Sequence, residues 1–178
     1  METVVSIRIN YVQQARRGNE KAIRELYRQY ADGMYNLCVR MCSDTELSKD
    51  ILQDAFINAF RNLAQLKDDN LFGGWLKRIV INECLRQMKQ SKRVTDFAES
   101  SFEIPVEEGG WFEDIDISVV NEEIKKLPDG CRQVFVLYAL EDYSHKEVAN
   151  TLQISESTSK SQYQRARALL RERLLNIN

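Results

Sequence analysis

The first half of the chain carries apolar residues at three- and four-residue spacing, which is the period of an amphipathic helix. After Gly18, Asn19 can cap a helix whose apolar face begins at Ala22 and continues to Met41. The pattern fits one long helix, or two helices with a break near Gly33. Only two prolines and seven glycines occur in 178 residues, which also favours helix.

Two further helices follow in the same pattern. Ser43 and Glu46 have the spacing of a capping box, in which each side chain satisfies a free backbone amide at the start of a helix. The helix that they open has a broad apolar face. Residues 67–70 then interrupt the pattern, and another helix starts at Trp75. We therefore predict a compact helical bundle over residues 1–93.

A second group of helices is predicted over residues 119–178. Ser144 and Glu147 repeat the capping-box spacing, and Ser155 can cap the last helix. Two helices joined by a turn as short as residues 153–155 must cross at a large angle, which is the helix-turn-helix arrangement. The four predicted helices are Val119–Leu127, Arg132–Leu140, Ser144–Leu152 and Ser155–Leu175.

The segment 94–118 between the two groups is acidic. It holds eight Asp or Glu residues and no Lys or Arg, and it contains Pro105 and the pair Gly109 and Gly110 without a sustained period. This composition predicts a linker, although large apolar residues give it the means to dock, namely Phe97, Phe102, Ile104, Trp111 and Phe112. The predicted fold is all-α, with a helical bundle (1–93) and a helix-turn-helix domain (119–178) joined by an acidic linker (94–118).

The overall composition, 43% hydrophobic and 29% charged, is that of a globular protein. The longest uninterrupted apolar run, residues 134–140, is too short to cross a bilayer, and the N-terminus lacks the apolar region of a signal peptide. We therefore expect the protein in the cytoplasm. The four cysteines are predicted to be reduced and mostly buried. With a single histidine in the chain, we expect no metal and no cofactor.

The last helix combines hydrogen-bonding side chains with cations. Residues 154–170 read ISESTSKSQYQRARALL, and residues 160–173 hold five cations against Glu172 alone. In a helix-turn-helix the second helix lies in the major groove, where such side chains contact base edges and phosphates. We predict an outward face of Thr158, Ser161, Gln162, Gln164 and Arg165. With Ser155, Lys160 and Arg167, these residues make up the predicted DNA contacts of this helix.

Two stretches carry a resemblance to a known family. The segment LPDGCRQVFVLYALEDYSHKEVANTLQISESTSKSQYQRARALL resembles domain four of bacterial sigma factors. SKDILQDAFINAF and FGGWLKRIVINECLRQMKQSKR are similar to domain two. Since no third domain lies between them, the resemblance is to the extracytoplasmic-function group. It implies a specificity subunit that binds core RNA polymerase, recognises promoter DNA and assists melting, under the control of an anti-sigma protein. It implies neither catalysis nor a small-molecule substrate.

The resemblance assigns a polymerase-binding role to the helix after residue 46. Its residues Asp50, Gln53 and Asp54 match positions that bind the clamp helices of the largest polymerase subunit, and carboxylates suit an arginine-rich partner helix. Phe56 can complete that interface or belong to the core. The polymerase flap is the further contact that the resemblance implies.

The minus-10 element is assigned to the loop 66–72 and the helix that follows. Melting requires groups that hold a base turned out of its stack. The predicted base contacts are Asp68, Asp69, Asn70 and Asn82, and the predicted backbone contacts are Lys77, Arg78, Arg86 and Lys89. Trp75 follows the apolar period of its helix and is expected in the core.

The chain departs from the family pattern at four positions. Gln153 lies at a turn position where glycine is frequent, and glycine tolerates left-handed dihedral angles. Ser157, Ser159 and Tyr163 replace glycine, valine and leucine. A buried Ser159 hydroxyl needs a partner, for which a backbone carbonyl one turn back is the candidate. The linker either threads toward the RNA exit path, where its carboxylates would be displaced by transcript, or serves as a solubilising tether.

Two other classes of protein account for fewer of these features. A dimeric transcription regulator would explain the helix-turn-helix but leaves the DILQDAF and WLKRIVIN helices without a role. An enzyme would need a site that the sequence does not offer. Glu46, Asp50 and Asp54 have metal-site spacing, but helical di-metal sites usually include histidine, and His145 is far away in the sequence. No nucleophile elbow or phosphate-binding glycine loop occurs.

Overall fold

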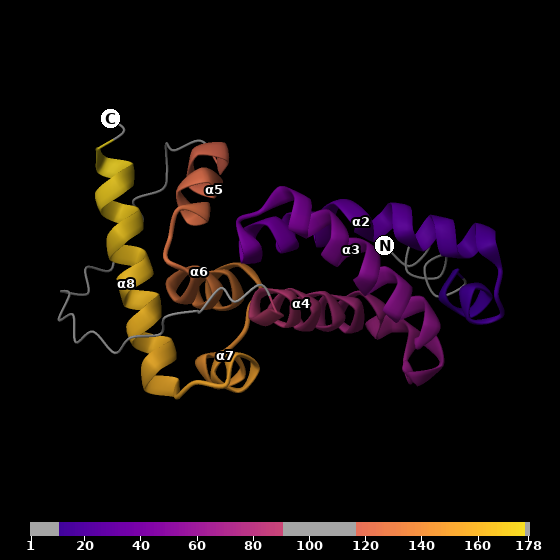
Figure 1. The fold of residues 1–178 in the computed structure, drawn as a ribbon. Helices are drawn as coiled ribbons and strands as arrows, with labels where there is room; N and C mark the ends of the chain where they lie inside the picture. The colour runs from indigo at the N-terminus through magenta and orange to yellow at the C-terminus, as the bar shows by residue number, and fades with distance from the viewer. Residues whose placement is uncertain (1–10, 91–116, 177–178) are drawn as a thin grey trace. The chain divides into compact units, whose positions relative to one another are not determined.

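The computed structural model describes residues 11–90 and 117–176, and within these ranges the chain forms helices, turns and loops without a strand (Figure 1). The all-α prediction is confirmed. The chain divides into two compact units, residues 1–92 (unit 1) and residues 93–178 (unit 2). Apart from residues 117 and 118, the predicted acidic linker lies outside the described residues. No helix in the described ranges has the length and apolarity to span a membrane.

Unit 1 is built from three long helices that pack on one another. Residues 11–16 add a short helix before them. Two 3₁₀ turns make up most of the connection between the last two long helices. The elements are α2 (Glu20–Cys42), α3 (Thr45–Arg61), η1 (Leu63–Gln65), η2 (Asp69–Leu71) and α4 (Phe72–Gln90).

The helix boundaries of unit 1 follow from local hydrogen bonds. Asn19 caps α2 as predicted, since its side chain accepts a hydrogen bond from the Ala22 amide. The helix then runs without a break through Gly33, so the single-helix alternative is correct. The predicted capping box at Ser43 is wrong. Ser43 ends α2 in a left-handed conformation with φ 54°, and Asp44, whose Oδ1 lies 3.0 Å from the Leu47 amide, caps α3 instead.

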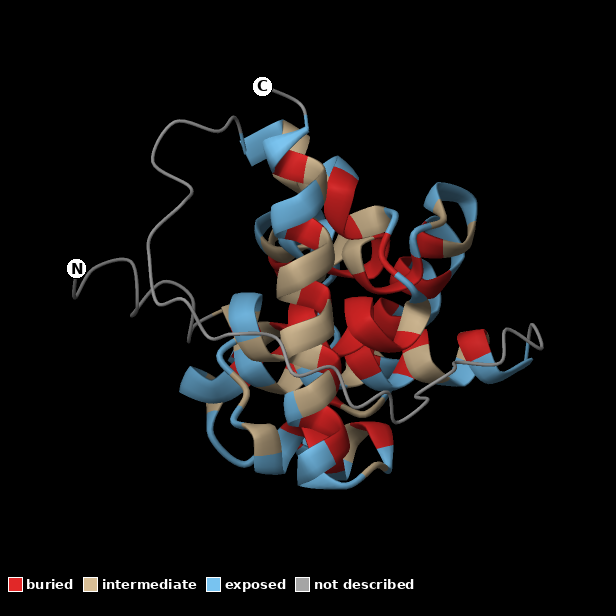
Figure 2. Ribbon diagram, turned by 90° about the vertical axis from the view of Figure 1, so that its left-hand side faces the viewer, coloured by how far each residue is buried: buried red, intermediate tan, exposed pale blue. Residues whose placement is uncertain are grey.

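The interior of unit 1 lies between its three long helices. Figure 2 colours the described residues by burial, with the buried ones in red. Leu26 of α2, Ile51 of α3 and Leu76 of α4 are fully buried. Tyr30 lies over the start of α4, where a Cβ added at Gly73 would come within 3.1 Å of its ring. Glycine at position 73 therefore allows α2 and α4 to approach closely.

Unit 2 consists of short helices packed on one long one. Figure 1 shows α8 running along one side, with α5, α6 and α7 against it, and all three contact it. A π-helical turn follows α6 directly. The elements are α5 (Ile117–Lys125), α6 (Asp129–Phe135), η3 (Val136–Leu140), α7 (His145–Leu152) and α8 (Glu156–Leu175).

The helix-turn-helix is formed by α7 and α8. The predicted capping box at the start of α7 is confirmed, with the Ser144 side chain and the Glu147 side chain each bonded to the other residue's amide. Ser155 caps α8 as predicted, accepting from the Thr158 amide at 3.0 Å. Between them Gln153 adopts φ 60° and ψ 42°, the left-handed conformation for which glycine is usually selected.

Candidate nucleic-acid interface

The α3 helix presents a polar face next to its buried one. Asp50, Gln53 and Asp54 are all exposed. Their neighbours Ile51, Leu52 and Ala55 are buried, so the amphipathic pattern of the sequence separates the two faces. The Asp54 carboxylate lies 3.8 Å from a guanidinium nitrogen of Arg86 on α4.

Phe56 belongs to the core. Its side chain is 3% exposed, and its ring centroid lies 4.7 Å from that of Tyr27 on α2 and 5.8 Å from that of Phe60. Of the two alternatives for Phe56, the structure supports the core one. The exposed apolar neighbours on this surface are Tyr27 and Ile57.

The loop between α3 and α4 is held by an arginine from the first helical segment. Arg16 donates from Nη2 to Asp69 Oδ1 at 2.6 Å and to the Leu66 carbonyl at 3.0 Å. The Asp69 side chain is 12% exposed and occupied by this ion pair. Asp69 was predicted to contact a base. Instead, its carboxylate fixes the loop to the body of unit 1.

Asp68 and Asn70 remain on the outside of the same loop. Asp68 caps η2, because its Oδ1 accepts from the backbone amide and from the side-chain amide of Asn70, at 2.9 and 2.8 Å. The carboxylate therefore orients the Asn70 side chain. These two contacts make the loop tip a preorganised polar edge.

A pocket of about 390 Å³ opens beside this loop tip. Asp68 and Asn70 contribute one wall, and Trp75 and Arg78 of α4 contribute another. Trp75 was expected in the core, but it is half-buried: its ring packs on Phe72 with centroids 6.2 Å apart while also lining the pocket. The remaining lining residues are Gln65, Leu66, Lys67, Leu71 and Gly74.

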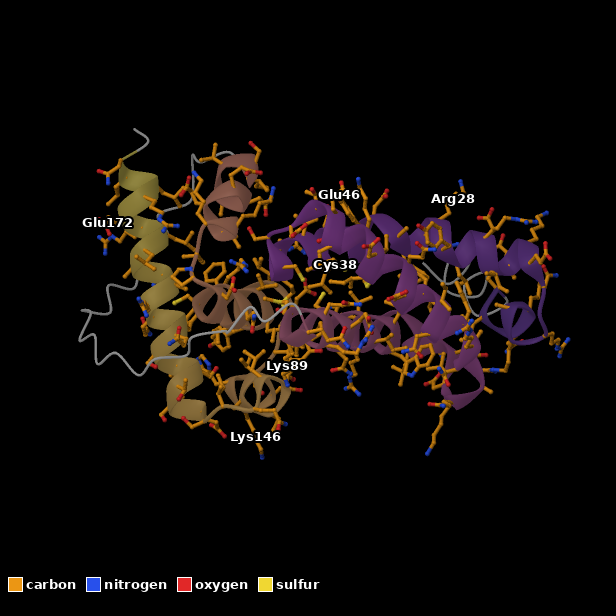
Figure 3. All side chains as sticks on the ribbon, in the orientation of Figure 1. Arg28, Cys38, Glu46, Lys89, Lys146 and Glu172 are labelled. Carbon is orange, nitrogen blue, oxygen red and sulfur yellow. The ribbon has the colours of Figure 1, made fainter. Side chains whose placement is uncertain are left out.

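One face of α4 continues from this pocket along the surface. Arg78, Asn82, Arg86 and Lys89 are exposed, at spacings of three and four residues that align them on one side, and Lys77 is half-buried. Figure 3 shows Lys89 on this helix, and it shows Cys38 of α2 in the interior and Glu46 of α3 on the surface.

Arg86 forms an ion pair with a carboxylate of its own helix. Its Nε lies 3.0 Å from Glu83 Oε2, and its Nη2 also contacts Oε1 of the same carboxylate. Glu83 is 8% exposed. The hydrogen bonds from Arg86 lower the pKa of Glu83 below its ordinary value, which keeps the pair ionised. Arg86 therefore offers less charge to a phosphate than the sequence indicated.

The exposed face of α8 differs in part from the predicted one. Lys160 is exposed, and Ser161, Gln164, Arg165 and Arg167 are half-buried. Ser155 is exposed, and its hydroxyl lies 2.7 Å from that of Ser157. The guanidinium carbon of Arg167 lies 5.8 Å from the centroid of the Tyr163 ring, a cation–π distance.

Two predicted outward residues of α8 point inward. Gln162 is 1% exposed, and its Oε1 accepts a hydrogen bond from Cys131 Sγ of α6 at 3.0 Å. Thr158 is 7% exposed, with its hydroxyl 2.8 Å from that of Ser155. The prediction of an outward face for both residues is therefore wrong. A polar side chain can face the interior when it finds a buried partner, and no sequence period reports such a partner.

Ser159 is buried, as its position predicted, but its partner is different. The residue is 0% exposed, and its hydroxyl lies 2.9 Å from Nδ1 of His145, the only histidine of the chain. A backbone carbonyl was expected. Instead, a side chain from the first turn of α7 satisfies the hydroxyl.

The cysteines are free and buried, in agreement with the sequence prediction. Hydrogen bonds with Cys38 and Cys42 raise the pKa of the Cys84 thiol well above its ordinary value, and burial adds to the effect. Such thiols are inert. Within residues 11–90 and 117–176, no group of three or more His, Cys, Asp or Glu side chains is arranged to hold a metal ion.

Sequence reasoning missed two residues of this interface, Arg16 and Glu83. Arg16 lies in a polar segment ahead of the first predicted helix, and its partners are 50 and 53 positions away. Glu83 falls on the buried side of α4, where a lone carboxylate is not expected. Its spacing of three residues from Arg86 was the one available signal.

Family models match both units of the chain. The model described as Sigma-70 region 2 matches residues 26–94, and the one described as Sigma-70, region 4 matches residues 119–170. Together they cover unit 1 from α2 onward and most of unit 2. Each therefore contains one half of the interface described above.

Relatives with known names cover nearly all of the chain. The ECF RNA polymerase sigma factor SigW of Bacillus subtilis is 30% identical over 99% of this chain and 100% of its own length. The RNA polymerase sigma-H factor of Pseudomonas aeruginosa is 29% identical over 88% of both chains.

Two solved structures share the fold. CnrH, solved in complex with the cytosolic domain of CnrY, is 24% identical with a TM-score of 0.56, over 96% of this chain and 98% of that one. RpoE of Bartonella quintana, solved with the anti-sigma factor NepR, is 19% identical with a TM-score of 0.58, over 89% and 99%. With two matched regions in order and full-length relatives, the chain belongs to the extracytoplasmic-function (ECF) sigma factors of RNA polymerase.

Proposed function

We propose that this ECF sigma factor holds core RNA polymerase through the exposed face of α3. Asp50, Gln53 and Asp54 offer carboxylates and an amide to the clamp helices of the largest subunit, where arginine is the fitting partner. The neighbouring exposed Ile57 supplies apolar area at the same surface. Phe56 supports this face from the interior and makes no contact with polymerase.

The pocket beside the loop tip is the proposed site for the unstacked base of the minus-10 element. A volume of about 390 Å³ is at the lower end of small-ligand pockets. Asn70, oriented by Asp68, supplies hydrogen-bonding groups, and Trp75 supplies an aromatic surface. Arg78, Asn82 and Lys89 then continue along the backbone of the strand, with Lys77 beside them. This pocket is the observation that carries the proposal.

The α8 helix is the proposed reader of the minus-35 element. Lys160, Ser161, Gln164 and Arg167 lie on its accessible side, with Arg165 beside them. Ser155, at the helix start, approaches the backbone, where the first amides of a helix favour a phosphate. Thr158 and Gln162 are excluded from direct contact because their side chains are buried.

Regulation and domain organisation are proposed from the relatives and from the sequence. The neighbour from Bartonella quintana was solved with an anti-sigma factor, and we propose a partner of that class for this chain. The proposed division is domain two over 1–93, the acidic linker over 94–118 and domain four over 119–178, the last also meeting the polymerase flap. The linker serves as a tether or follows the RNA exit path. The site of action is with the polymerase, in the cytoplasm. Sigma factors are not enzymes, so the chain's own residues catalyse no step.

The test is run-off transcription with purified core RNA polymerase on a library of promoter fragments. The triple variant D50A/Q53A/D54A is expected to lose core association at least about tenfold, because truncating charged interface groups costs several kcal/mol in total. The matched control is E20A/R24A, which removes an exposed ion pair on α2. A protein that never associates with core but still shifts duplex DNA would favour a free-standing regulator.

The pocket is tested separately on the same promoters. W75A is expected to leave core association unchanged and to reduce open-complex formation about tenfold, since base–aromatic stacking contributes roughly 1–3 kcal/mol. Permanganate reactivity of unpaired thymines measures opening directly. Normal opening by W75A would place the flipped base elsewhere.

A further inference from the structure

Two of the four departures from the family pattern meet around one imidazole. His145 is the first residue of α7, and it contacts Ser159 and Tyr163, the residues that replace valine and leucine in α8. The ring also stacks on Tyr138 of η3, with centroids 4.0 Å apart and an interplanar angle of 11°. His145 therefore joins three consecutive elements of unit 2.

The hydrogen bond between His145 and Ser159 lies inside the seam between α7 and α8. Ser159 is 0% exposed, so water is excluded from its hydroxyl, which lies 2.9 Å from His145 Nδ1. A buried hydroxyl that loses its partner carries the full cost of desolvation. The hydrogen bond is also directional, whereas the contacts of an apolar valine at position 159 would not be.

The aromatic contacts restrict the ring from the other sides. Tyr138 covers one face of the imidazole, and the Tyr163 ring meets it edge-on at 5.9 Å and 64°. Tyr138 and Tyr163 also contact each other, with centroids 4.6 Å apart. These contacts hold the imidazole where its Nδ1 meets the Ser159 hydroxyl.

We propose that His145 is the positioning residue of the recognition helix: its Nδ1 and its ring faces fix the angle at which α8 leaves α7. This inference rests on the proposed function, in which α8 reads the minus-35 element. The short turn 153–155 requires a large crossing angle, and the His145 contacts add constraints on its exact value. A recognition helix must enter the groove with its first turns aligned to base edges. Ser159 and Tyr163 are the residues of α8 that His145 contacts in this arrangement.

The protonation state of His145 affects its contact with Ser159. In the neutral ring, Nδ1 either accepts from the Ser159 hydroxyl or donates to it, whereas the protonated ring makes both nitrogens donors. Burial lowers the pKa of His145, Lys160 of α8 lowers it further, and Glu156 of α8 opposes them. The start of α7 also disfavours a cation. The other groups that face the ring are Tyr138, which stacks on it, and Tyr163, which meets it edge-on.

The test uses holoenzyme reconstituted from core polymerase and the full chain. Affinity is measured for the duplex that the wild type selects from a randomised minus-35 pool, and for a random duplex. H145F keeps an aromatic face but lacks Nδ1, and its expected loss is about tenfold on the selected duplex and much less on the random one. Adding S159A, which removes the orphaned hydroxyl, is expected to restore most of the affinity. E122A, an exposed charge on α5, serves as the control.

A pH series separates positioning from simple packing. The wild type is expected to lose at least about threefold in specific affinity between pH 8 and pH 5.5, and the part of this loss that H145N lacks reports on His145, the one histidine of this chain. H145N, whose amide replaces Nδ1 without titrating, is expected to bind well at both pH values.

Three outcomes overturn the inference. The first is wild-type specificity in folded H145F, and the second is a loss of specificity in H145N as complete as that in H145F. If H145F does not fold, H145N alone decides, and a pH response in H145N equal to that of wild type contradicts the assignment. A wild type that selects no duplex contradicts the proposed function itself, and the inference with it.

Discussion

In unit 1 the loop proposed to receive the minus-10 base is tied down by a side chain from a distant part of the sequence, whereas in unit 2 the proposed recognition helix is tied to the helix just before it. Arg16 reaches Asp69 across 53 positions. His145 reaches Ser159 across 14. Each contact holds an element that we propose to bind DNA, and the contacting residue itself is not a proposed DNA contact.

The difference follows from the local structure on each side. The η1–η2 loop has few hydrogen bonds of its own, and the Leu66 carbonyl is satisfied by Arg16. The start of α8 is already capped by Ser155, and the start of α7 by its capping box. A connection of two short 3₁₀ turns is stabilised by an outside contact, while the capped helix α8 needs only its angle to be set.

Removal of Arg16 is the largest expected perturbation of this comparison. R16A takes away the ion pair with Asp69 and the bond to the Leu66 carbonyl together. Because the Arg16 side chain is 34% exposed, we expect a loss of only about 1–2 kcal/mol in stability. Open-complex formation is expected to fall at least about tenfold, because the loop tip loses its position.

The control for this experiment is R17A, which changes an exposed neighbour in the same turn. Core association and minus-35 binding should be unchanged in R16A, and permanganate reactivity should show the defect. Equal promoter opening by R16A and R17A would mean that the loop holds its shape without the distant support.

Local features were predictable from the sequence, and the structure confirms several of them. Asn19, Ser144 and Ser155 cap helices where their spacing indicated, because a cap depends only on residues one turn away. Ser43 was assigned wrongly because two adjacent polar residues, Ser43 and Asp44, both suit a cap. The left-handed end of α2 decides between them.

Features that depend on partners far along the chain were not predictable. Asp69 and Asn70 are adjacent polar residues that both received the same prediction from the sequence. In the structure it is Asp69 that forms the ion pair with Arg16. The sequence predicts that Gln162 contacts a base, but in the structure its side chain accepts a hydrogen bond from Cys131 of α6. Each of these roles depends on the fold that brings the partners together.

Substitution of Glu83 tests its ion pair with Arg86, a local contact within α4 of unit 1, and has a smaller expected effect. Because the pKa of Glu83 is lowered in the folded protein, its contribution to stability is present above its unfolded pKa of about 4.3 and is lost as pH falls through the folded pKa. E83Q is expected to cost about 1 kcal/mol at pH 7, since Arg86 is half exposed.

Thermal unfolding of the full chain between pH 7 and pH 3.5 provides the measurement. The difference between wild type and E83Q should shrink toward zero at the acid end. E46Q, at an exposed position on α3, is the matched control. A difference that stays constant with pH would show that Glu83 contributes through packing rather than through its charge.

The smallest expected effect sharpens the comparison from the side of unit 2, at the turn between α7 and the proposed recognition helix α8. Gln153 holds φ 60°, which costs a non-glycine residue roughly 1 kcal/mol, while glycine loses more backbone entropy on folding. Q153G is therefore expected to stabilise the folded chain by about 0.5 kcal/mol, measured by thermal unfolding.

The same variant separates stability from positioning. If the His145 contacts set the angle of α8, Q153G should gain its stability without changing minus-35 specificity, because the turn keeps its conformation while the seam is untouched. S43G at the end of α2, where φ is 54°, is the matched control in unit 1 and should gain a similar amount. A loss of specificity in Q153G, with its stability raised, would instead assign the angle of the recognition helix to the turn.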